Sequence, residues 1–191
     1  MDDEEFWGLI EGSRRQSEDP DDRLDWLRGQ LMQRSLPEIV RFKVRLDEAR
    51  VPIDNWPMWA AAGRIYRGFC SDDSFWYFQV WLIGLGREAY QRAAADPDSL
   101  AELPEVRRLA GRPMDSWADE EFPDWESLDY VAAEAYEELT GEEDGLEDAM
   151  EAAGLESPAC PEPSGEPWRG EGETARRLPR LTALFPVATE G

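Results

Sequence analysis

The 191-residue sequence contains no histidine, only two cysteines and a single lysine. Histidine is the usual general base near neutral pH and the commonest zinc ligand, so any acid–base chemistry would have to use Asp, Glu, Cys or Tyr. The two cysteines, Cys70 and Cys160, provide neither a disulfide framework nor a thiolate metal site. We therefore expect no metal and no cofactor.

Long apolar runs are also missing. The longest nearly apolar run, residues 75–85, is too short to cross a bilayer. The N-terminal segment is acidic, whereas a secretory signal begins with basic residues. These features predict a cytoplasmic protein without a membrane-spanning segment.

Positive charge is scarce, because 43 acidic residues face only 20 basic ones and give a net charge of −23. Such a chain has little capacity to displace counterions from nucleic-acid phosphates, and an anionic membrane surface repels it. We therefore expect neither nucleic-acid nor membrane binding. The same field attracts a basic protein partner.

The spacing of apolar residues predicts helices along most of the chain. No segment alternates between apolar and polar residues as a half-buried strand does, so the expected fold class is all-α. A hydrophobic content of 41%, with 11% aromatic residues, supports a packed core. The expected helices begin near residues 2, 20, 35, 54, 70 and 87, and further helical segments are expected at 100–103, 105–109, 124–139 and 146–153.

The densest aromatic segment is 54–96, which contains four of the nine tryptophans. Within it, residues 75–83 are apolar almost all round, which is typical of a helix that other helices surround. We therefore expect a compact multi-helix domain around this aromatic-rich helix.

Composition divides the chain into three parts. Residues 1–153 form the predicted helical domain. Residues 154–174 are rich in Pro, Gly and Glu and predict a flexible acidic linker. Residues 175–191 contain a short amphipathic segment with arginines and a leucine stripe, which we expect to dock back on the acidic domain. A free recognition segment is the alternative.

Three distinctive motifs occur in this chain: the acid-Phe-Trp pattern at 3–7, Ser-Leu-Pro-Glu-Ile-Val at 35–40, and the stretch from Trp59 to Cys70-Ser-Asp-Asp with the Phe-, Tyr- and Trp-rich helix after it. Together they resemble one bacterial family, catalogued only as domain of unknown function 4240. The resemblance covers about residues 1–140, and residues 165–185 also resemble the usual end of the family. It implies a small, cytosolic helical domain and carries no established activity or catalytic residue.

One candidate ligand site lies where the fourth and fifth predicted helices meet. A thiol at a helix N-terminus can act as a nucleophile, and arginine and aromatic side chains can line a pocket. The structural alternative makes Ser71 an N-cap, Asp72 and Asp73 partners of the helix dipole, and the aromatic rings core residues; the two acids should then raise the thiol pKa. The candidate residues are Trp59, Arg64, Cys70, Ser71, Asp72, Asp73 and Tyr77.

A second candidate surface is the acidic stretch 115–148. Residues 140–145 do not match a calcium-binding EF-hand loop, so a solvated acidic face is the simpler interpretation. The predicted helix at 124–139 should present part of this face to a partner through Asp129, Glu134, Glu137 and Glu138.

These features support two hypotheses of different classes. The first is a non-enzymatic interaction or regulatory protein whose acidic surface binds a basic protein partner, as an immunity protein or antitoxin does. The alternative is a small-ligand-binding protein or enzyme that uses the cleft between the fourth and fifth helices. Nucleic-acid mimicry would require carboxylates spaced like phosphates, which a sequence cannot show.

Overall fold

The computed structural model describes residues 1–68, 70–155, 163–168 and 170–187. This part of the chain is an all-α domain without a strand; its only β-type contact is an isolated bridge between Asn55 and Ser164. None of its helices has the length and apolar character needed to cross a membrane. The α-helices are α1 (Asp3–Gln16), α2 (Pro20–Leu31), α3 (Leu36–Arg50), α4 (Trp56–Ile65), α5 (Asp72–Gly84), α6 (Arg87–Ala95), α7 (Pro104–Leu109), α8 (Glu126–Thr140), α9 (Gly145–Ala152), α10 (Glu171–Arg177) and α11 (Pro179–Leu184). Short 3-10 helices are η1 (Val51–Ile53), η2 (Pro97–Glu102), η3 (Met114–Ser116) and η4 (Asp119–Glu121).

Helix starts follow from side chains that satisfy the first free backbone N–H groups. At α3, the Glu38 carboxylate accepts a hydrogen bond from the Ser35 backbone N–H at 3.0 Å, as the expected capping box requires. At α5, the Ser71 hydroxyl accepts from the Ser74 backbone N–H at 3.2 Å. Helix α3 therefore begins directly after the expected cap Ser35, and α5 begins at Asp72, two residues after the expected start near residue 70.

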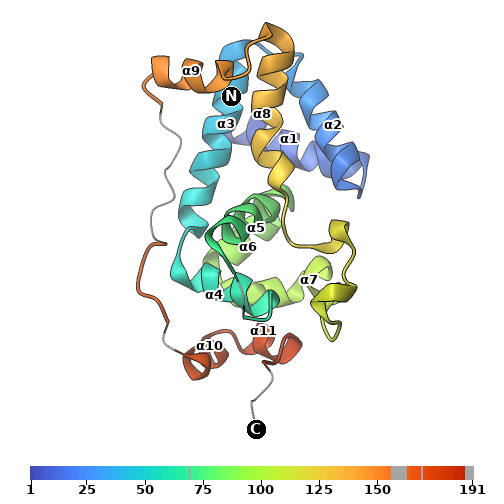
Figure 1. Ribbon diagram of the computed structural model, residues 1–191, viewed down its shortest axis with the longest axis vertical. Coiled ribbons are helices and arrows are strands. Elements are labelled where there is room, and N and C mark those ends of the chain that lie inside the picture. Colours follow the sequence, from blue (N-terminus) through green and yellow to red (C-terminus); the bar gives the residue numbers. More distant parts are fainter. Residues whose placement is uncertain (69, 156–162, 169, 188–191) are drawn as a thin grey trace.

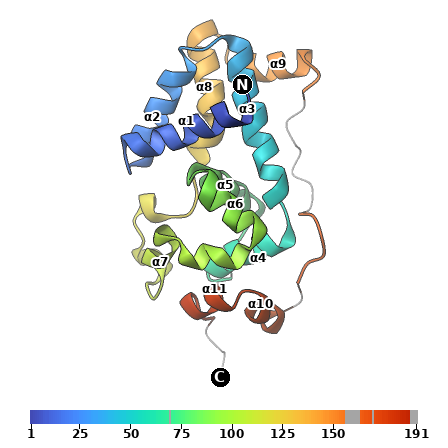
Figure 2. The same cartoon turned by 180° about the vertical axis from the view of Figure 1, so that it is seen from behind.

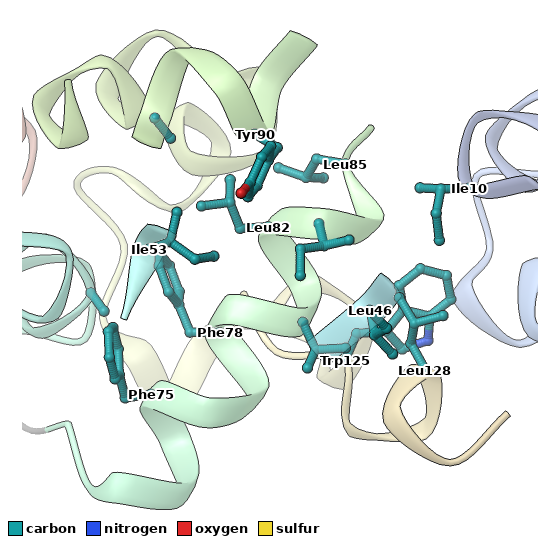
Figure 3. Packing of buried hydrophobic residues seen from close by; sticks show 14 of the residues in the cluster. Ile10, Leu46, Ile53, Phe75, Phe78, Leu82, Leu85, Tyr90, Trp125 and Leu128 are labelled. Carbon is teal, nitrogen blue, oxygen red and sulfur yellow. The ribbon is translucent and has the colours of Figure 1, made fainter. Parts of the chain in front are cut away.

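Helix α5 occupies the middle of the molecule. In Figures 1 and 2 it lies between an upper group formed by α1, α2, α3 and α8 and a lower group formed by α4, α6, α7 and α11. Its buried side chains include Phe75, Phe78 and Leu82, which Figure 3 shows within the core. The almost continuous apolar surface of this helix is therefore covered on several sides, as the sequence predicts.

The C-terminal end of α5 is a close crossing point. The indole ring of Trp125, from the segment before α8, lies against Gly84, and a Cβ atom at Gly84 would stand 2.5 Å from that ring. The Trp125 backbone N–H donates to the Tyr77 carbonyl at 3.3 Å. This bond and the non-helical backbone of Trp125 place the start of α8 at Glu126, two residues after the expected start at 124.

Helices α10 and α11 lie against the lower end of the domain (Figure 1), where α11 contacts η2 and α4. Leu178, Leu181 and Phe185 are fully buried there. The Asp98 carboxylate, on a residue 3% exposed, accepts hydrogen bonds from the backbone N–H groups of Arg180 and Leu181 at 3.1 and 2.9 Å. Asp98 thus serves as the N-terminal cap of α11, although it lies about 80 residues earlier in the chain.

The expected linker, residues 154–174, lies partly outside the described residues, as does Cys160. Within the described part, Ser164 lies beside the start of α4, where its carbonyl accepts from the Trp56 backbone N–H at 3.1 Å. Helix α10 begins at Glu171, whereas the amphipathic segment was expected from residue 175.

Two helical glycines should respond oppositely to substitution by alanine. Gly84→Ala should lower the free energy of unfolding by about 1–3 kcal/mol, because the new methyl group meets the buried Trp125 ring. Gly29→Ala, in α2 with open space around its Cα, should raise it by about 0.5–1 kcal/mol, because alanine restricts the unfolded chain and favours helix. Urea denaturation of both variants measures the difference, and equal effects would refute the close crossing at Gly84.

Candidate functional site

The helical hairpin of α4 and α5 brings aromatic side chains together as packing partners. The rings of Trp59 and Phe75 have centroids 4.6 Å apart, and Trp56 lies 5.7 Å from Trp59. Ser71 caps α5, and Asp72 and Asp73 occupy its first turn, near the positive end of the helix dipole.

The thiol of Cys70 precedes this cap and is partly buried. Burial, followed by the neighbouring carboxylate of Asp72, raises the pKa of Cys70 to about 12. The direction matches the expectation from the sequence, but burial is a larger cause than the acids. The protonated thiol is a poor nucleophile at neutral pH.

Arg64 lies beneath the C-terminal helices. Its side chain is 2% exposed, and its Nη2 atom lies 2.6 Å from the Glu171 carboxylate of α10. Its Nε and Nη1 atoms are buried and have no hydrogen-bond partner in the described part of the chain. Nearby, the Arg67 guanidinium donates to the Arg112 carbonyl at 2.6 Å and faces the Phe185 ring. The surface of α4 that was expected to line a cleft is therefore covered by α10 and α11.

Tyr77 turns toward α8. Its hydroxyl donates to the Glu126 carboxylate at 2.7 Å, and this hydrogen bond is the main reason that the pKa of Tyr77 is raised. The candidate residues of the hairpin thus engage several neighbours: Trp59 contacts α5, Arg64 contacts α10 and Tyr77 contacts the start of α8.

Asp129, one of the four carboxylates expected on the acidic face, lies inside the fold. It accepts a hydrogen bond from the lone lysine, Lys43, at 2.9 Å and another from the Trp76 indole N–H at 2.9 Å. Lys43 also pairs with Asp47 at 2.9 Å. These bonds join α3, α5 and α8, so Asp129 holds helices together.

The pKa values of Lys43 and Asp47 reflect both burial and their charged neighbours. Burial lowers the pKa of Lys43, but the carboxylates of Asp47 and Asp129 outweigh it, so the net pKa is raised. The pKa of Asp47 is raised as well, because burial exceeds the opposing effect of Lys43. The lysine is therefore a required counterion for carboxylates that water does not fully solvate.

The remaining carboxylates of the expected face divide between two environments. Glu134 pairs with Arg28 of α2 at 3.4 Å. Glu137 and Glu138 are exposed, and exposed acids continue through the turn into α9. We call this region the acidic corner; it consists of Glu137, Glu138, Glu142, Glu143, Asp144, Glu147, Asp148 and Glu151. Across the described residues, no group of three or more acidic or thiol side chains is arranged to hold a metal ion.

A cleft that the sequence analysis missed has a volume of about 640 Å³. It lies between the α1–α2 turn, the end of α5, helix α7 and the segment from Glu120 to Trp125. None of the seven hairpin residues proposed as a ligand site lines it.

The inner wall of this cleft contains two arginines that cap α5. Arg14 donates to the Leu85 carbonyl, and Arg23 donates to the Gly84 carbonyl at 2.6 Å while its guanidinium lies 4.3 Å from the Trp125 ring centroid. The sequence contains a signal for Arg23, because Arg23, Leu27 and Leu31 recur every fourth residue and so share one face of the helix. In the structure all three side chains are buried.

Comparison with known families gives one match. The family model described as "Protein of unknown function (DUF4240)" matches residues 1–138. This region contains the α4–α5 hairpin and every residue that lines the cleft, whereas most of the acidic corner lies beyond it. No curated protein and no solved structure matches the chain.

The Cys70 thiol should resist alkylation. In a Cys160→Ser protein at pH 8, iodoacetamide should modify Cys70 at least about tenfold more slowly than free cysteine, because a pKa near 12 leaves little thiolate. Mass spectrometry over time gives the rate, and unfolding in urea should restore normal reactivity. A rate in the folded protein equal to that of free cysteine would contradict this account.

Lys43→Met should lower the free energy of unfolding by about 3 kcal/mol at pH 8, because Asp47 and Asp129 lose their counterion. Burial already raises the pKa of Asp47, and without the lysine this folded-state pKa rises further above its unfolded value. The folded variant then takes up protons before the unfolded chain does, so its deficit should shrink as the pH falls toward 5.

Urea denaturation of wild type and variant at both pH values tests this expectation. Arg45→Met is the matched control, because Arg45 lies on the same helix and, among the described residues, forms an ion pair only with the exposed Glu48. Arg45→Met should lower the free energy of unfolding by less than about 1 kcal/mol. A Lys43→Met deficit independent of pH would show that lost packing, rather than lost charge, is the cause.

Proposed function

The chain belongs to the DUF4240 family, proteins of unknown function, and we propose that it is a non-enzymatic interaction protein whose acidic corner binds a basic protein partner. We place it in the bacterial cytoplasm, as the motif resemblance implies. An immunity-type or antitoxin-type inhibitor, which covers a basic surface of another protein, is one form of this proposal.

The observation that carries the proposal is the concentration of exposed carboxylates at one end of the molecule. The eight residues of the acidic corner are all exposed, and residues 113–168 contain no lysine or arginine to neutralise them. Figure 1 shows the end of α8 and helix α9 together at the end of the domain opposite α10 and α11. Charge concentrated on one end steers a basic partner toward that end.

Elsewhere, several basic side chains already have acidic partners. Arg87 pairs with Asp3 and Glu4, Arg112 pairs with Glu121, and Arg180 pairs with Asp96, Asp98 and Glu102. These ion pairs reduce the negative field around α1, α6 and η2. The field at the acidic corner has no such compensation within its own segment.

The α4–α5 hairpin gives less support to the alternative of a ligand-binding or catalytic cleft. Arg64 is covered and paired with Glu171, Trp59 packs on Phe75, and the pKa of Cys70 is raised. A binding protein that acts through its exterior fits these contacts better.

Neutralising the acidic corner should abolish capture of the partner. The test variant carries Glu142→Gln, Glu143→Gln and Glu147→Gln. The matched control removes the same charge elsewhere, from exposed residues, through Glu88→Gln, Asp115→Asn and Glu166→Gln. Pull-downs from native cell lysate at about 50 and 500 mM salt, read by mass spectrometry, should give a high-pI protein at low salt with wild type and control only.

If the wild type, the test variant and the control all capture the basic protein, the capture depends on overall net charge rather than on the acidic corner. Absence of any salt-sensitive basic protein would refute the proposed function itself.

A further inference from the structure

The cleft between α1, α5, α7 and the Glu120–Trp125 segment combines features of a small-molecule site. Its volume of about 640 Å³ falls within the range of ligand pockets. Trp81 and Phe122 line it and are only partly buried, so they offer apolar surface to an occupant. It differs in place and composition from both the acidic corner and the α4–α5 hairpin.

One wall of the cleft has excess positive charge. Arg14 and Arg23 both face the C-terminus of α5, whose dipole is equivalent to only about half a negative charge. The Glu105 carboxylate, 3.3 Å from Arg14, is a further partner. Arg23 is 8% exposed and forms no ion pair with any carboxylate that the structure describes.

The cost of this arrangement appears in the pKa of Arg23. Burial, followed by repulsion from Arg14, lowers the pKa of Arg23 to about 10, and the Glu105 carboxylate only partly offsets this shift. Arg108 of α7, which is exposed, adds a third guanidinium to the cleft lining. An anionic group in the cleft would relieve this repulsion and supply the missing counterion.

The acidic side chains of the cleft are of two kinds. Asp19 caps α2, Glu105 pairs with Arg14, and Glu121 pairs with Arg112. Glu18, Glu120 and Asp124, by contrast, form no ion pair with a described basic group, and all three are exposed at the cleft. Desolvation of its carboxyl group by neighbouring atoms, followed by repulsion from Glu126 and Asp119, raises the pKa of Asp124. A cationic group beside Asp124 would be stabilised.

We propose that this cleft binds a small zwitterion with an apolar body, its carboxylate held by Arg23 and Arg108, its ammonium by Asp124, and its apolar part by Trp81 and Phe122. Such a molecule supplies an anion to the arginines and a cation to the aspartate at the same time. A polyphosphate would meet the acids of the rim, and a simple amine would leave Arg23 without a counterion. Free amino acids with apolar side chains and short apolar peptides share the required chemistry.

Calorimetric titration of the wild-type protein separates these ligand types. The probes are L-phenylalanine and the dipeptide L-phenylalanyl-L-leucine, whose charges stand farther apart. The single-charge analogues are 3-phenylpropionate, which lacks the ammonium, and 2-phenylethylamine, which lacks the carboxylate. At least one zwitterion should bind, and removing either charge from L-phenylalanine should weaken binding at least about tenfold. The zwitterion that binds more tightly shows whether the ligand class is free amino acids or short peptides.

Exposed side chains of the cleft allow variants that leave the core intact. Asp124→Asn should weaken the binding of L-phenylalanine about as much as loss of the ammonium group does. It should leave the binding of 3-phenylpropionate unchanged. Arg108→Gln should weaken the binding of L-phenylalanine and of 3-phenylpropionate. It should leave the binding of 2-phenylethylamine unchanged. The matched controls are Asp115→Asn and Arg107→Gln, exposed residues outside the cleft lining, which should bind all probes as wild type does.

Three results would overturn the proposal. They are no binding of either zwitterion at about 20 mM, equal binding of L-phenylalanine and one of its single-charge analogues, and full affinity in Asp124→Asn. Failure to capture a salt-sensitive basic protein would refute the proposed function without bearing on these titrations, so the two proposals fail independently.

Discussion

The need to cover the apolar surface of α5 governs much of this structure. A helix that is apolar almost all round is stable in water only when other helices surround it. Helices α1, α3, α4, α6 and α8 supply that cover, and the polar groups that remain on α5 find internal partners. Trp76 donates to Asp129, and Gln79 accepts from Arg50 at 2.9 Å. The ends of α5 pose the remaining problem, because its last carbonyls have no partner within the helix. Arg14 and Arg23 satisfy two of them, and this solution brings the arginines to the inner wall of the cleft.

The sequence predicts best what depends on neighbours along the chain. The caps at Ser35 and Ser71, the all-round apolar character of α5 and the all-α class follow from residues a few positions apart. Contacts between distant residues are different. Helical spacing in the sequence places Asp129 on the same face as other acids. In the structure its partner is Lys43, 86 positions away in the chain. Helical spacing alone could not show that this carboxylate points inward.

The same limit applies to the candidate sites. Arg64 could be placed on α4 from the sequence, but its cover by Glu171, 107 positions later, could not. The cleft has walls from the α1–α2 turn, the end of α5, α7 and the segment before α8, so no local pattern marks it. Arg23 was the available signal, since a charged residue in register with Leu27 and Leu31 must have an internal partner.

The cap that Asp98 provides to α11 has a consequence for the stability of this protein. A helix of six residues has no independent stability, and the first free N–H groups of α11 are satisfied by a carboxylate on η2. The stability of α11 therefore depends on an acid that lies about 80 positions earlier in the chain. The closed lower end of the molecule, where Leu181 and Arg64 are buried, is thus only as stable as the η2 turn that holds Asp98 in place.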